Sequence, residues 1–462
     1  MAGADDEPAT NEPATNEPAT NEPAAIVRAD WVVVGDPTSA GSVLEDGAVL
    51  VVGERIAAVG PAARVLADHP GVPVERLERH VLVPGMVNAH AHLAMTMFRG
   101  TADDRDLADF LAVVMPLEAR TLTREHVEVG TRSAAVELLR GGVTSSLDMY
   151  FHTVVGRRAA AEVGLRVLTG PTIIEGGPST LPWDDLMVHA STFLAEHPSD
   201  GAWRPVLGPH GTYTVSPSQL DEVAALAGAH DCIVQIHLSE TEAENQMVLE
   251  RLGRRPLDVL DAAGLLGPDT VLAHGVHLNA DEQRRVAAAG AAVAHCPVSN
   301  LKLASGVAPV PGLLAAGVTV ALGTDGAASA NDLDLLAVLR LTALLHKGAP
   351  SGPDGPDATN LAAAVALRMA TLGGAIALGI DDHTGSIEEG KLADLVAVDL
   401  ADPATEPVRD PVAAVVYGAS RSQVRSVWVA GERAVRDGRC VNVDERDVVA
   451  ALRRLGDELL RG

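Results

Sequence analysis

At 462 residues the chain is long enough to bury a large core, and one large domain with a smaller accessory domain is the expected organisation. The 35 basic and 62 acidic side chains give a formal charge of −27, which argues against nucleic acid or an anionic membrane as a partner. No apolar run approaches the roughly 20 residues that span a bilayer, and the acidic start of the chain does not resemble a signal peptide. The three cysteines are far apart and indicate free thiols in a reducing compartment, so we expect a cytoplasmic protein.

The first segment of the chain is a five-residue repeat, Asn-Glu-Pro-Ala-Thr, which occupies residues 6–24. It contains no large apolar side chain, so it cannot bury enough surface to fold. We therefore expect residues 1–24 to form a disordered acidic tail with no part in the chemistry.

Two regions near the ends of the chain carry β-rich runs separated by Gly, Pro and Asp turns. The runs are residues 26–34, 48–52, 55–59, 385–398 and 424–429. We expect residues 25–84 and 385–445 to combine into one small β-sandwich module. The acid, base and leucine pattern of residues 446–462 predicts a C-terminal surface helix.

Residues 85–384 alternate β-rich runs with Ala/Leu/Glu-rich segments of helical periodicity. Eight runs are predicted strands: 86–92, 143–150, 166–174, 204–210, 232–237, 270–274, 291–295 and 318–324. Eight strands with intervening helices over about 300 residues are typical of an α/β fold of the (β/α)8 TIM-barrel type. The strands are nearly continuous in apolar residues, as parallel strands covered on both faces should be.

Polar residues recur where these strands end. They are His90, His92, Asp148, His210, His237, His274, His295 and Asp325. Barrels of this type build their active site at that edge, and core packing alone gives no reason for histidine to recur there. His90 and His92 are two positions apart on one strand, so both side chains point the same way. They are either a packed or solvated pair or half of a metal site.

Three imidazoles and one carboxylate, from His90, His92, His237 and Asp325, suit Zn²⁺ with one position left open for water. The fourth strand ends at His210 without a lysine that could bridge two metals as a carbamate, so we expect a single divalent ion. Fe²⁺ is an alternative, because a site of nitrogen and oxygen ligands also suits iron.

Five motifs carry a resemblance to a known family. They are Pro84-Gly-Met-Val-Asn-Ala-His-Ala-His92, His237-Leu-Ser-Glu240, Ala273-His-Gly-Val-His277, His295-Cys-Pro-Val-Ser-Asn-Leu-Lys302 and Gly323-Thr-Asp-Gly-Ala-Ala-Ser329. Their order resembles that of the amidohydrolase superfamily, in the branch of the 5′-methylthioadenosine/S-adenosylhomocysteine deaminases and the related triazine chlorohydrolases. The resemblance extends over residues 26–440.

The resemblance implies a role for each site residue. His90, His92, His237 and Asp325 are the implied metal ligands, and the second oxygen of Asp325 would take a proton from the activated water. Glu240 would protonate the ring nitrogen beside the attacked carbon, and His274 would orient the nucleophile. The bland alternative for Glu240 is a solvated loop acid.

Two further residues resemble substrate contacts of the family. Glu118 would grip the ribose hydroxyls and His210 would contact the purine; a helix-surface acid and a structural histidine are the alternatives. Two departures stand out. Gly170 and Pro171 replace the arginine that members binding an amino-acid-bearing nucleoside place near the end of the third strand. The expected loop at residues 101–115 offers Phe110 but no tryptophan for stacking.

The sequence therefore predicts a metal-dependent hydrolytic deaminase that converts an adenine nucleoside to its inosine counterpart and ammonia. The nucleoside is adenosine, 5′-methylthioadenosine or another 5′-modified adenosine, and we expect a homo-oligomer. One alternative is a hydrolase of another N-heterocycle: a guanine or pterin deaminase, or a triazine chlorohydrolase. The alternative of another class is a non-catalytic barrel that acts as a binding or assembly protein, although such chains usually lose ligand positions. The chain lacks the H-x-E and P-C-x-x-C pattern of cytidine deaminases.

Overall fold

The computed structural model describes residues 24–175, 181–348 and 356–459. The predicted acidic tail lies outside these ranges except for Ala24. Within them, no helix combines the length and the apolar character that crossing a bilayer requires.

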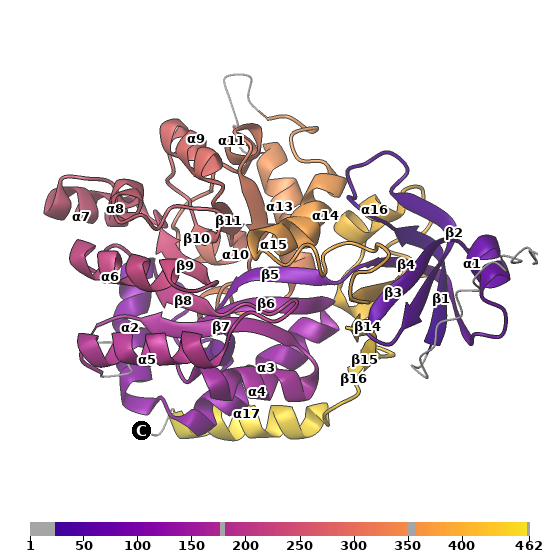
Figure 1. The fold of residues 1–462 in the computed structure, drawn as a ribbon, viewed down its shortest axis with the longest axis horizontal. Coiled ribbons are helices and arrows are strands. Elements are labelled where there is room, and N and C mark those ends of the chain that lie inside the picture. Colours follow the sequence, from indigo (N-terminus) through magenta and orange to yellow (C-terminus); the bar gives the residue numbers. More distant parts are fainter. Residues whose placement is uncertain (1–23, 176–180, 349–355, 460–462) are drawn as a thin grey trace, which may run out of the picture.

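Eight parallel strands form a barrel sheet in the order β12-β11-β10-β9-β8-β7-β6-β5 (Figure 1). Their bounds are β5 Met86–Ala91, β6 Val143–Tyr150, β7 Arg166–Ile173, β8 Val206–Pro209, β9 Ile233–Leu238, β10 Thr270–His274, β11 Ala292–His295 and β12 Thr319–Leu322. The predicted barrel fold is confirmed, and no strand end differs from its predicted position by more than two residues.

The barrel is joined at the seam between its first and last strands. The side-chain amide of Asn88 donates from Nδ2 to Oγ1 of Thr324 over 2.8 Å and accepts the Thr324 amide at Oδ1 over 2.9 Å. The amide of Asp325 donates to the carbonyl of His90 over 3.1 Å. The seam therefore sets His90 and Asp325 side by side at the carboxyl edge of the sheet.

Helices surround the barrel (Figure 1). Their bounds are η1 Leu93–Phe98, α2 Leu107–Thr121, α3 Arg124–Arg140, α4 Thr153–Val163, α5 Trp183–Glu196, α6 Pro217–Gly228, α7 Glu242–Leu252, α8 Pro256–Ala262, α9 Ala280–Ala289, α10 Pro297–Lys302, α11 Val310–Ala315, α12 Ala327–Ala330, α13 Leu335–Gly348, α14 Ala363–Ala370 and α15 Leu372–Ala377. Local sequence explains their starts: Ser216 and Gln219 form a capping box at α6, with Pro217 at the first helical position.

One expectation was wrong. Residues 101–115 are not a loop throughout, because helix α2 begins at Leu107, after the side chain of Asp106 caps the amide of Asp109. Pro116 inside this helix and apolar residues on much of its surface hid the helical pattern.

The second sheet unites both ends of the described chain, as predicted, and its strands pair continuously in the order β16-β15-β14-β13-β4-β1-β2-β3. The strands are β1 Ala24–Val33, β2 Val43–Val52, β3 Arg55–Pro61, β4 Val74–Pro84, β13 Leu395–Asp399, β14 Val424–Val429, β15 Glu432–Arg436 and β16 Arg439–Cys440. Short helices α1 Ala62–Asp68, α16 Pro411–Ala413, η2 Ala414–Gly418 and η3 Arg421–Gln423 connect them. Helix α17 Glu445–Leu459 returns along α3 (Figure 1).

A buried ion pair ties this sheet to the barrel. Arg166, at the start of β7, donates to the carboxylate of Asp394 over 2.6 Å, and the Asp394 side chain is only 1% exposed. Thr384 and the amide of Ala430 also donate to this carboxylate. Burial raises the pKa of Asp394, but the guanidinium and these hydrogen bonds outweigh burial and hold the pKa below its ordinary value.

We expect Asp394→Asn to lower the free energy of unfolding by about 3–5 kcal/mol, because it leaves the Arg166 charge buried without its partner. Since the folded-state pKa is lowered, this contribution is complete above the unfolded pKa of about 4 and is lost as the pH falls through the folded value. Chemical denaturation measures the change. Asp46→Asn, which breaks an exposed pair with Arg28, is the control and should cost less than about 1 kcal/mol.

Candidate active site

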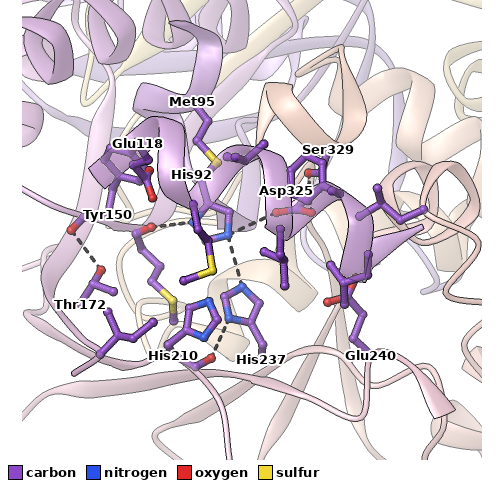
Figure 2. Close-up of a pocket in the computed structure, with 18 of the residues that line it drawn as sticks. His92, Met95, Glu118, Tyr150, Thr172, His210, His237, Glu240, Asp325 and Ser329 are labelled. Carbon is purple, nitrogen blue, oxygen red and sulfur yellow. Dashed lines mark hydrogen bonds and ion pairs between the residues drawn. The ribbon is translucent and has the colours of Figure 1, made fainter. Parts of the chain in front are cut away.

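Side chains from strands far apart in the sequence converge at the carboxyl edge of the barrel (Figure 2). His90 on β5 and His92 directly after it each place Nε2 3.4 Å from Oδ1 of Asp325. His237 on β9 places its Nε2 3.2 Å from Nε2 of His92. Ligand atoms of His90, His237 and His274 lie within 4.8 Å of one another, as do those of His90, His92 and Asp325. The four predicted metal ligands therefore form one cluster.

The cluster fits a cation. Nδ1 of His92 lies 2.6 Å from the carbonyl of Met149, and Nδ1 of His237 lies 2.7 Å from the carbonyl of His210. A carbonyl can only accept, so both Nδ1 atoms carry the proton and both Nε2 atoms present lone pairs. These lone pairs face each other, and the fully buried Nε2 of His90 has no hydrogen-bond partner among the described residues. Ring nitrogens that present lone pairs beside a carboxylate are suitable ligands for a divalent ion.

The charge states agree with this fit. Burial lowers the pKa of His90 to about 4, and burial together with neighbouring imidazoles holds the pKa of His237 well below its ordinary value. Burial raises the pKa of Asp325, but the surrounding histidines outweigh it and keep the carboxyl ionised. Neutral imidazoles and an ionised carboxylate are the forms that ligate metals.

The two predicted proton-transfer residues adjoin the cluster. Nε2 of His274 lies 3.6 Å from Oε2 of Glu240, and Nδ1 of His274 donates to Oδ1 of Asn300 over 2.8 Å. Glu240 is 4% exposed, which contradicts the reading as a solvated loop acid. Burial raises the pKa of Glu240, while the charge of His274 lowers it in part. Burial lowers the pKa of His274, but the carboxylates of Glu240 and Asp325 outweigh burial and raise it.

The backbone is strained at the same edge. His274 has φ = 73° and Asp325 has φ = 60°, in the left-handed region that residues other than glycine rarely adopt. Strain of this kind persists where the surrounding structure imposes it, and it clusters at functional sites.

His92, His237 and Asp325 of the cluster line a cavity at the carboxyl edge of the barrel. Glu118, on α2, and His210, directly after β8, both line it, as the sequence predicts. Glu118 is 5% exposed and is therefore not a helix-surface acid. In Figure 2, Glu118 and Tyr150 lie on one side of the cavity and Glu240 on the other. Two of the polar strand-end residues lie elsewhere: Asp148 accepts the amide of Leu93 over 2.8 Å, and His295 faces His346.

Sequence reasoning missed four polar residues that line this cavity: Tyr150, Thr172, Tyr213 and Ser329. Ser329 donates to Oδ2 of Asp325 over 2.7 Å, and the phenol of Tyr150 donates to Oε1 of Glu118. Ser329 stands in one of the recognised motifs, four residues after Asp325, so its helical spacing was a usable signal. For Tyr150 the only signal was its position at a strand end.

The departure at Gly170 has a structural reason. A β-carbon built on Gly170 would lie 1.7 Å from the carbonyl oxygen of Val206, on the neighbouring strand. No side chain fits between β7 and β8 at this point, so the arginine that the resemblance leads one to expect has no room there.

A parallel eight-stranded barrel with this cluster at the carboxyl ends of its strands defines the class of metal-dependent barrel hydrolases. Residues 81–434 match the model of the Amidohydrolase family, and the chain belongs to this family. A short segment, residues 47–71, matches the model of an imidazolonepropionase-like composite domain of bacteria.

Three similar proteins show how far the likeness extends. A 5-methylthioadenosine/S-adenosylhomocysteine deaminase of Syntrophobacter fumaroxidans is 41% identical over 90% of this chain and 96% of its own length. The crystal structure of an adenosine deaminase from Xanthomonas campestris with bound zinc has a TM-score of 0.90 and 37% identity, over 95% of this chain and 99% of that one. The atrazine chlorohydrolase of Arthrobacter aurescens, complexed with zinc, has a TM-score of 0.84 and 28% identity, over 94% and 100%.

We expect His237→Ala to lose most of its bound metal, because the substitution removes one donor. Affinity should fall by more than the roughly 10–100-fold that is typical when a partner outside the ligand set is lost. Metal analysis by mass spectrometry measures this, together with the shift in unfolding temperature on adding a chelator. His230→Ala, outside the cluster, is the control and should keep its metal. Full metal content in His237→Ala would contradict the assignment.

Proposed function

We propose that this protein is a zinc-dependent hydrolytic deaminase that converts an adenine nucleoside to the inosine counterpart and ammonia. The observation that carries the proposal is the convergence of a cation-binding cluster, a buried acid and a second buried acid in one cavity. These are the cluster of His90, His92, His237 and Asp325, with Glu240 and Glu118 on opposite sides. The named relatives that act on adenine nucleosides support it.

A divalent cation in the cluster would supply a water of lowered pKa as the nucleophile. Oδ2 of Asp325, which accepts from Ser329, is the oxygen placed to take the proton of that water. His274 presents Nε2 toward the same region, because Asn300 holds its Nδ1 proton, so His274 orients the nucleophile.

Glu240 acts as the proton shuttle. Burial raises its pKa and so favours the protonated acid, which gives its proton to the ring nitrogen beside the attacked carbon. This proton neutralises the negative charge that the attack places on the ring. The proton that Asp325 took from the water then passes to the amino group, which leaves as ammonia, while Glu240 takes the proton of the new hydroxyl group and is restored. Ser305 donates to Oε1 of Glu240 over 3.2 Å and holds the carboxyl in place.

The other contacts favour a nucleoside. A carboxylate such as Glu118 suits the two hydroxyl groups of ribose, which a free base lacks. The ring centroid of His210 lies 4.9 Å from that of His237, beside the metal-binding cluster. At this position His210 can contact the purine of a bound nucleoside. The proposal includes iron as the alternative to zinc, and it includes adenosines that carry a modified 5′ group.

A hydrolase of another N-heterocycle is the second candidate, favoured by the similarity to the atrazine chlorohydrolase. Glu118 distinguishes the two candidates, because a triazine offers no diol. A non-catalytic barrel is disfavoured by the complete set of donors and the adjoining acid. A cytoplasmic location and a homo-oligomeric state are also proposed; all three cysteines are buried and unpaired, as a reducing compartment favours.

We expect the purified protein to release ammonia from adenosine or a 5′-modified adenosine, with the ultraviolet absorbance change of adenine to hypoxanthine. A panel of adenosine, 5′-methylthioadenosine, guanine, a pterin and a chlorotriazine, assayed for ammonia and chloride, tests this. Turnover of a free heterocycle with none of any adenine nucleoside would replace the first candidate by the second.

We expect Glu240→Gln to retain its metal and to lose roughly 10²–10⁴-fold in kcat, as removal of a general acid–base group does. Steady-state ammonia release and metal analysis measure the two effects separately. The matched control is Glu242→Gln, since Glu242 lies two residues later and is 68% exposed. An unchanged kcat in Glu240→Gln would refute the role.

A further inference from the structure

Glu118 occupies a position that is unfavourable for a carboxylate. It lies in the last turn of α2, where the carbonyl end of the helix disfavours negative charge. It is 5% exposed, and no Lys, Arg or His of the described residues forms an ion pair with it. Burial raises the pKa of Glu118 to about 7, against a hydrogen bond from Tyr150 that lowers it. A carboxyl group that is buried without a cationic partner, although burial destabilises its ionised form, is typical of a binding site.

The phenol of Tyr150 is the polar partner that the structure gives this carboxylate. Its hydroxyl donates to Oε1 of Glu118. Tyr150 ends strand β6 and is 3% exposed. Its carbonyl accepts Oγ1 of Thr172 over 3.1 Å, and its ring meets that of Phe151 edge to face, with centroids 5.5 Å apart. The phenol is therefore held by the barrel itself, whereas Glu118 comes from a helix that covers the cavity.

Oε1 of Glu118 accepts from the phenol on the barrel wall, and Glu118 also lines the cavity (Figure 2). A hydrogen bond to an ionised acceptor is strong and directional. Without it, the carboxylate would be free to rotate among the apolar side chains of α2 that line the same cavity, such as Phe110 and Val114.

We propose that Tyr150 is a positioning residue that aims the Glu118 carboxylate at the ribose hydroxyls and so makes the enzyme selective for ribosides over dideoxyribosides. The inference rests on the proposed function. Tyr150 lies beside Glu118, on the side of the cavity away from Glu240 (Figure 2), so its phenol contributes to binding and not to the proton transfers at the base.

The test compares adenosine with 2′,3′-dideoxyadenosine in the metal-loaded enzyme. Tyr150→Phe should raise KM for adenosine roughly tenfold or more, as loss of a hydrogen bond to a charged group does. Its kcat should change little, because the lost interaction serves the bound substrate and the transition state alike. For the dideoxy substrate, kcat/KM should stay within about twofold of wild type, since this substrate has no 2′ or 3′ hydroxyl group for Glu118 to bind.

Two further variants separate positioning from support of the fold. Glu118→Gln should abolish the preference for adenosine, and adding Tyr150→Phe to it should cause no further loss, because the two residues act as a unit. Tyr417→Phe is the control: Tyr417 lies in η2, is 37% exposed and does not line the cavity. It should leave the ratio of the two kcat/KM values unchanged.

The outcomes are distinct. Equal kcat/KM for both nucleosides in the wild type would overturn the inference and leave the proposed function standing. A loss of kcat in Tyr150→Phe on both substrates alike would reduce Tyr150 to a structural role and overturn it too. If Tyr150→Phe does not fold by circular dichroism, Tyr150→Leu, which also lacks the phenol donor, takes its place, and a preference for adenosine kept in that variant would overturn the inference. Failure of the wild type on every nucleoside would overturn both proposals.

Discussion

The site depends on how the barrel closes. Asn88 and Thr324, which are 236 positions apart, exchange two hydrogen bonds across the seam between β5 and β12. The amide of Asp325 then bonds to the carbonyl of His90. These bonds place the single carboxylate of the cluster against two imidazoles of the first strand. Every role that we assign to the cluster requires this contact between the two ends of the barrel sheet.

Burial gives the residues around the cluster their different charge states. Burial keeps His90 and His237 neutral, while Asp325 stays ionised because the imidazoles surround it. Glu240 and Glu118 lack a cationic partner of that strength, so burial raises the pKa of both. Low-polarity surroundings therefore raise the pKa of an acid, except where imidazoles surround it as they surround Asp325.

Much of this architecture was readable from the residues alone. Nearly continuous apolar runs and their spacing predicted the eight barrel strands, because strands buried on both faces leave little choice of side chain. The convergence of His90, His92, His237 and Asp325 was predictable because parallel strands end at one edge. Contacts that depend on the path of a helix were not. Pro116 obscured the helical part of 101–115, and the bond between Tyr150 and Glu118 depends on how α2 lies over the cavity, which no local pattern encodes.

The close contact of Gly170 with the carbonyl of Val206 limits how the substrate range of this enzyme can change. A long cationic side chain at that position cannot arise by one substitution, since even a methyl group would displace the neighbouring β8. Laboratory evolution toward substrates that bear an amino acid would therefore have to place a charge at another position around the cavity. The packing of two adjacent strands thus closes one evolutionary route.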